Sequence, residues 1–153
     1  MSETTTLPVL LLRPGSRPEL VADCVTALEE EVASKTGIGG MALKGAYRSV
    51  KAIQPGFIPA VMNALLEEWS TELDGEFQAW KKDGGGQPFE GWLLDRKEQV
   101  ADQMLAVTDR RAERSVHVAA KKVYMKLRPK AKEQVLVALP RVSRVLSRYL
   151  EDT

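Results

Sequence analysis

Residues 44–57 read KGAYRSVKAIQPGF, and this stretch decides the fold. It predicts one helix, a forced break and the start of a second helix. Lys44, Arg48 and Lys51 share one helical face at i, i+4 and i+7, and apolar side chains fill the other face. Pro55 ends the first helix, because the residue before a proline is pushed out of helical geometry.

Apolar residues recur at three- and four-residue spacing along the whole chain, and no alternating strand pattern is present. The spacing predicts helices at about residues 17–34, 41–53, 57–80, 96–111, 116–127 and 130–149, with a short helical or looped segment at 89–94. Asp74-Gly75 is expected to kink or split the third helix, and Pro140 to kink the last. We therefore expect an all-α fold, a compact bundle of about six to seven helices.

Other residues are expected to set helix boundaries. Three glycines within residues 36–40 should interrupt the chain, because glycine weakens helix propagation. Gly45 costs a helix up to about 1 kcal/mol relative to alanine, which a close helix crossing would explain. Asp95 and Ser115 are candidate N-caps. Arg128-Pro129 is expected to force a break as Gln54-Pro55 does.

The pattern around residues 44–57 recurs in degenerate form in the second half of the chain. Residues 17–23 also align with residues 96–102, with five of the seven positions identical. The alignment makes two pairs of residues structurally equivalent, Tyr47 with Tyr124 and Pro55 with Pro129. We interpret residues 1–153 as one domain of two three-helix units, with repeat one at about 17–82, a linker at 83–88 and repeat two at about 89–150.

The chain resembles an uncharacterised family of short all-helical bacterial proteins, a domain of unknown function. The resemblance rests on KGAY (44–47), VK (50–51), PGF (55–57), LAVTD (105–109), KKVY (121–124), LRP (127–129) and ALP (138–140). Together these segments span residues 17–150. The resemblance implies an all-helical fold and carries no known activity, cofactor or site residue.

The composition is that of an ordinary globular domain, with 44% hydrophobic and 28% charged residues in a 153-residue chain. The single cysteine, Cys24, cannot form an internal disulfide, so we expect a cytoplasmic protein. No run reaches the roughly 18 apolar residues of a membrane span. The apolar run Leu7–Leu12 fits a signal peptide poorly, and we expect residues 1–8 to be a mobile tail that leads into a short docking element.

Charge is divided unevenly along the chain. Residues 1–109 contain 10 basic and 17 acidic side chains, a net charge of −7, whereas residues 110–153 contain 12 and 4, a net charge of +8. This asymmetry could steer the protein toward an anionic partner. It could equally attract one half of the molecule to the other, or to a second copy.

The sequence contains no recognisable reaction centre. His117 is the only histidine, and Cys24 lies on an apolar helical stripe without a second cysteine. We therefore expect no metal site and no cofactor. Residues 84–86 are three glycines, but no Gly-Lys-Ser/Thr follows them as a phosphate loop requires. The chain is predicted not to be an enzyme.

The leading hypothesis is a helical domain that acts through contacts with a protein partner or with itself, and Phe89 and Trp92 are the candidate interface. The alternative is an accessory protein that binds nucleic acid or acidic lipid through its basic C-terminal third. The candidate anion-binding residues are Lys121, Lys122, Lys126, Arg128, Lys130, Arg141, Arg144 and Arg148. A third hypothesis, a carrier of apolar ligands, requires a cavity between the two repeats.

Overall fold

The computed structural model describes residues 5–150, which form eight helices and no strand. The helices are α1 (Leu7–Leu11), α2 (Arg17–Ser34), α3 (Gly37–Lys51), α4 (Phe57–Glu72), α5 (Asp74–Asp83), α6 (Phe89–Asp95), α7 (Lys97–Arg114) and α8 (Val118–Leu150). The all-α prediction is confirmed, with more helices than the six to seven expected.

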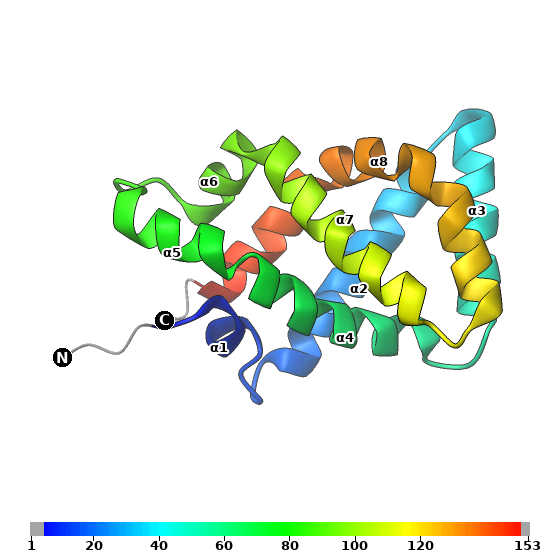
Figure 1. Ribbon diagram of the computed structural model, residues 1–153, viewed down its shortest axis with the longest axis horizontal. Coiled ribbons are helices and arrows are strands. Elements are labelled where there is room, and N and C mark those ends of the chain that lie inside the picture. Colours follow the sequence, from blue (N-terminus) through cyan, green and yellow to red (C-terminus); the bar gives the residue numbers. More distant parts are fainter. Residues whose placement is uncertain (1–4, 151–153) are drawn as a thin grey trace.

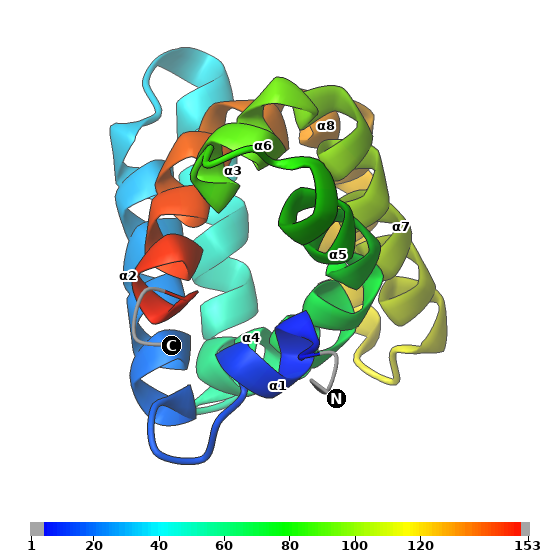
Figure 2. The ribbon, with the colours of Figure 1, turned by 90° about the vertical axis from the view of Figure 1, so that its left-hand side faces the viewer.

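The helices surround a single apolar core. Figure 2 looks along the molecule and shows α1 and α4 below this interior, α2 to its left, α5 and α7 to its right and α6 above it, while α8 passes from above it to its left, where its red end lies beside α2. The buried core includes Leu7 and Leu11 of α1, Leu20 of α2, Leu66 of α4 and Val100 of α7. Each of these residues lies on the inward apolar face of its helix.

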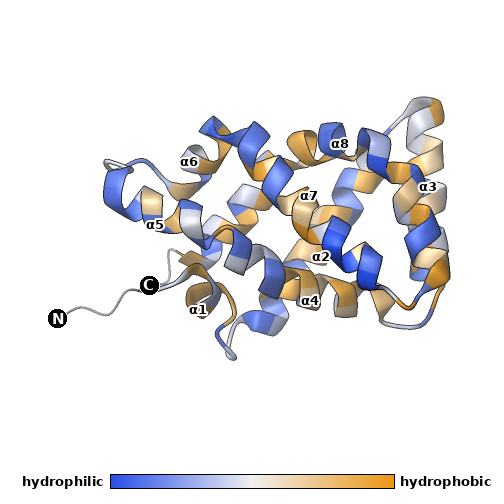
Figure 3. Cartoon of the chain, in the orientation of Figure 1, coloured by the Kyte–Doolittle hydropathy of each residue, from blue (hydrophilic) through white to orange (hydrophobic). Residues whose placement is uncertain are grey.

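Few side chains are buried at one end of the molecule. Among the described residues, α3 buries only Gly40, and α8 buries no residue before Leu139. Figure 1 shows α3 and the first part of α8 side by side at the right-hand end. Figure 3 shows hydrophobic residues at this same end, so apolar side chains lie there on thinly covered helices.

The predicted break at Pro129 is wrong, because α8 runs unbroken through both Pro129 and Pro140. A proline inside a helix removes one hydrogen bond and crowds the carbonyl four residues earlier. Pro129 and Met125, whose carbonyl loses its partner, are both exposed, so water can bind that carbonyl. Figure 1 shows the result as a curved helix that passes from α3 across the molecule rather than as two helices.

The glycine-rich segment also differs from the prediction. Helix α3 begins at Gly37, not at Met41, and Gly37 has a left-handed φ of 74° that turns the chain out of α2. A Cβ at Gly40 would lie 2.7 Å from the carbonyl carbon of Lys35, so this glycine permits a close approach. No atom lies within 4 Å of a Cβ built at Gly45, so no close helix crossing explains that residue.

The remaining helix boundaries lie close to their predicted positions, but the residues expected to cause them act differently. Leu73 separates α4 from α5, so the third helix is split rather than kinked. Asp95 does not cap α7; its carboxylate accepts a hydrogen bond from the Gln87 side chain at 2.8 Å. Ser115 accepts from the His117 amide at 3.1 Å, and α8 begins at Val118, not at Val116.

The N-terminal apolar run is a docked helix, so the tail predicted for residues 1–8 is wrong for the residues that the structure describes. Leu7 and Leu11 are buried, and the Leu7 amide donates to Asp74 Oδ1 at 2.8 Å. Residues 1–4 of that predicted tail lie outside the described residues. Within residues 5–150, no helix has the length and apolar character needed to cross a bilayer.

Candidate functional site

A groove of about 780 Å³ opens where the ends of α3, α4 and α7 meet the start of α8. Its lining residues from α3, α4 and the segment between them are Val50, Gln54, Phe57, Ala60, Val61, Leu65 and Glu68. Those from α7, α8 and the turn between them are Thr108, Arg111, Ala112, Arg114, Ser115, Val116, His117, Ala120, Lys121, Val123, Tyr124 and Leu127.

Apolar side chains form much of the groove lining. Phe57, Val61 and Leu65 recur at four-residue spacing on α4, which places them on one helical face. The His117 ring packs edge-on against Phe57, with centroids 5.0 Å apart and planes at 85°. Val116 lines the groove and is 85% exposed. The groove therefore presents apolar surface to solvent, which folded monomers normally bury.

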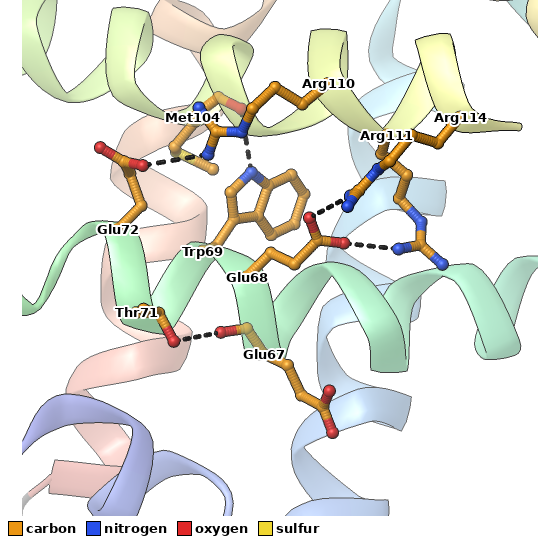
Figure 4. A network of polar contacts seen from close by, with 9 residues as sticks. All are labelled: Glu67, Glu68, Trp69, Thr71, Glu72, Met104, Arg110, Arg111 and Arg114. Atoms are coloured by element: carbon orange, nitrogen blue, oxygen red, sulfur yellow. Dashed lines mark hydrogen bonds and ion pairs between the residues drawn. The ribbon is translucent and has the colours of Figure 1, made fainter.

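Ion pairs between α4 and α7 form one wall of the groove. Figure 4 shows Glu68 held by two guanidinium groups, Arg111 at 2.5 Å and Arg114 at 3.0 Å. Beside them Trp69 donates its indole N–H to the Met104 carbonyl at 3.1 Å. Two positive charges share one carboxylate, so this wall keeps a net positive charge.

A second polar cluster joins α7 to α8 at the opposite wall. Tyr124 donates its hydroxyl to Asp109 Oδ1 at 2.5 Å, and Arg128 donates to both Asp109 oxygens at 2.8 and 3.1 Å. The hydrogen bond from Arg128 lowers the pKa of Asp109. Burial, together with the bond to Asp109, raises the pKa of Tyr124 to about 12. These groups fix α8 against α7 and leave the apolar floor between the two walls open.

The candidate anion-binding residues divide into two sets. Arg128 and Arg141 are ion-paired with Asp109 and Glu31, at 2.8 Å each. This pairing realises the expectation that one half of the chain attracts the other. The exposed members with no ion pair within residues 5–150 are Lys121, Lys122, Lys126, Lys130, Arg144 and Arg148.

The two aromatic residues expected at an interface belong to the core. Phe89 and Trp92 are 3% and 7% exposed, so neither side chain can meet a partner. Trp92 donates its indole N–H to Glu76 at 3.2 Å, and Arg96 stacks 3.4 Å over its ring. The exposed large apolar residues are instead Val9, Ile38, Met41, Val116, Val118, Met125 and Val137, and of these Val116 lines the groove. The signal in the sequence was an apolar pair, Val116 and Val118, on either side of the lone histidine.

The structure also places the candidate reactive groups. Cys24 is buried, and burial raises the pKa of its thiol to about 12, so the nucleophilic thiolate is suppressed at neutral pH. No group of three or more His, Cys, Asp or Glu side chains within residues 5–150 could hold a metal ion.

Comparisons with known proteins give one match. Residues 7–150 match a family described as a family of unknown function, DUF6918. No curated protein matches the chain. No solved structure matches it either.

Proposed function

Since the chain belongs to DUF6918, whose function is unknown, we propose that it is a non-enzymatic protein-interaction domain with the groove as its binding surface. The observation that best supports this is the apolar lining left open to solvent, with Val116 85% exposed. Exposed apolar grooves rimmed by charge are typical of protein-binding sites.

The occupant that fits this groove is an amphipathic helix from a partner protein with acidic side chains beside its apolar face. Phe57 and Val61 of α4 and Val123 and Leu127 of α8 all line the groove and give it apolar surface. Lys121 on α8 and the shared pair of arginines on α7 provide positive charge along the two walls. Helices bind such grooves through residues at i, i+3, i+4 and i+7.

A designed peptide tests this function. One helical peptide carries leucines at i, i+3, i+4 and i+7 with glutamates beside them, and its twin carries lysines in place of the glutamates. We expect fluorescence anisotropy to show binding of the glutamate peptide and much weaker binding of the lysine peptide. Val116→Glu should weaken the binding of the glutamate peptide at least about tenfold, because the substitution places a charge in the apolar groove.

Val137→Glu is the matched control, since Val137 is an exposed valine of α8, 59% exposed, that does not line the groove. It should bind the peptide as the unmodified chain does. The proposal is overturned if the glutamate peptide does not bind, or if Val116→Glu and Val137→Glu weaken its binding equally. Light scattering that shows a dimer abolished by Val116→Glu would identify a second copy of the chain as the occupant instead.

The alternative function, binding of an anionic polymer or acidic lipid, is favoured by one observation. Lys121, Lys122, Lys126 and Lys130 are exposed on the first part of α8 and have no ion pair within the described residues. Phosphate contacts by these lysines would make binding fall steeply with salt. Titration of a labelled duplex and of acidic vesicles at low and moderate salt tests this, and absence of binding at both removes it.

A further inference from the structure

A cavity of about 190 Å³ lies inside the core, apart from the groove. Side chains from α1, α2, α4, α6, α7 and α8 line it, among them Leu7, Leu66, Leu93, Val100 and Leu139. A dry cavity of about 150 Å³ with a similar lining takes up benzene or xenon. An empty cavity of this size leaves its lining atoms without dispersion partners, so an apolar guest stabilises the fold.

The cavity lining is almost entirely apolar. Its only charged residue is Glu31, whose carboxylate is paired with Arg141 at 2.8 Å and Lys35 at 3.4 Å. The hydroxyls of Ser70 and Thr108 donate to backbone carbonyls one turn away, at 3.1 Å each. These polar groups are satisfied within the protein, so the cavity does not fit a charged ligand.

Ser143 is the exception. It is 1% exposed, it lines the cavity, and its Oγ has no hydrogen-bond partner within residues 5–150. A buried hydroxyl without a partner costs free energy that a suitable ligand recovers. We propose that the cavity binds one small uncharged apolar molecule that carries a single hydroxyl or carbonyl group, and that Ser143 Oγ is its hydrogen-bond partner.

The cavity and the groove adjoin at Thr108, which lines both spaces. The Thr108 hydroxyl lies 2.7 Å from that of Tyr124, which is fixed to Asp109.

Calorimetric titration with phenol and benzene tests the proposal, because the two probes differ only in the hydroxyl group. Both should bind the unmodified chain. Ser143→Ala should weaken the binding of phenol about tenfold, because one hydrogen bond is lost, and should leave the affinity for benzene unchanged. Ser147→Ala is the matched control: its hydroxyl is also buried and unpartnered, on the same helix, but it does not line the cavity. It should change neither affinity.

Ala138→Leu should abolish binding of both probes, because Ala138 lines the cavity and the larger side chain fills it. Circular dichroism establishes that this variant folds; if it does not, the two serine variants decide the outcome. The proposal is overturned if neither probe binds the unmodified chain, or if Ser143→Ala and Ser147→Ala weaken the binding of phenol equally. It is also overturned if folded Ala138→Leu binds both probes with unchanged affinity. Val116→Glu should leave the affinities for both probes unchanged, so the test of the cavity is independent of the proposed function of the groove.

Discussion

Tyr124 on α8 donates its hydroxyl to the Asp109 carboxylate on α7 at 2.5 Å. Arg128, one turn after Tyr124, binds the same carboxylate. The first half of the chain contains a parallel arrangement, in which Tyr47 and Lys51 of α3 both contact Glu29 of α2, at 3.0 and 3.5 Å. Each tyrosine and its basic neighbour thus reach a carboxylate on the preceding 18-residue helix. A copied three-helix unit would require such a parallel, and the duplication itself stays a prediction.

Asp109→Asn should destabilise the protein at neutral pH by less than about 1 kcal/mol, because the carboxylate is partly exposed and its bonds are screened. The pKa of Asp109 is lowered in the folded state, chiefly by the Arg128 hydrogen bond. Its contribution is therefore complete above the unfolded pKa of about 3.9 and is lost as pH falls below that value. Urea unfolding of both proteins at pH 7 and pH 3 should show a larger difference in stability at pH 7 than at pH 3.

The tyrosines should ionise at unusually high pH. Burial and carboxylate partners raise the pKa of Tyr47 and of Tyr124 to about 12, and the pKa of Tyr149 is also raised. Their hydrogen bonds require the protonated phenol, so this stabilisation is present below the unfolded pKa of about 10 and is lost as pH rises through about 12. Tyrosinate absorbance should show no transition near pH 10 until the protein unfolds. A transition near pH 10 that Tyr124→Phe removes would contradict this.

Two glycines of α3 should respond oppositely to alanine. Gly45→Ala should raise the free energy of unfolding by up to about 1 kcal/mol, because its Cβ enters open space and alanine favours the helix. Gly40→Ala should lower it by about 1–3 kcal/mol, since its Cβ would overlap the Lys35 backbone. Thermal unfolding measures both. Equal shifts in the two variants would mean that the α2–α3 turn is not as close as the structure has it.

Pro129→Ala should stabilise the protein by about 1–3 kcal/mol, because alanine restores the helix hydrogen bond to the Met125 carbonyl. Pro18→Ala is the control: Pro18 lies in the first turn of α2, where a missing N–H costs nothing, and the variant should show no gain. Denaturant unfolding measures both variants. Destabilisation by Pro129→Ala would indicate that the bend in α8 is needed for its packing.

Phe89→Ala should destabilise the fold by about 3–5 kcal/mol, as expected for a large buried aromatic. Phe89 packs against Phe77 and Trp80, with centroids 5.5 and 5.3 Å apart, so its loss opens a void in that cluster. Val116→Ala, at an exposed groove residue, should change stability by less than about 0.5 kcal/mol. Thermal unfolding of both variants separates a core residue from a surface one. Similar losses of stability in the two variants would contradict the assignment of Phe89 to the core and Val116 to the surface.

The local sequence determined most of the helices. Apolar spacing located α2 at residues 17–34, and Pro55 with Gly56 ended α3 and began α4 as expected. These features are set by backbone sterics and by periodicity within a few turns. Residue type alone could not determine whether Pro129 breaks the helix or only bends it. The outcome depends on whether neighbouring residues hold the two parts of the helix together and whether water reaches the freed carbonyl.

The candidate sites were decided by the tertiary structure. Aromatic content suggested an interface at Phe89 and Trp92, but burial depends on which helices cover a side chain, and α5 packs against both of these residues. The groove at Val116 and the cavity at Ser143 each exist only because separate helices meet around them. The sequence by itself determined which segments are helical and which of their faces are apolar. Only the packing of those helices decided which apolar faces close into a core and which stay open, since that depends on contacts between residues far apart in the chain.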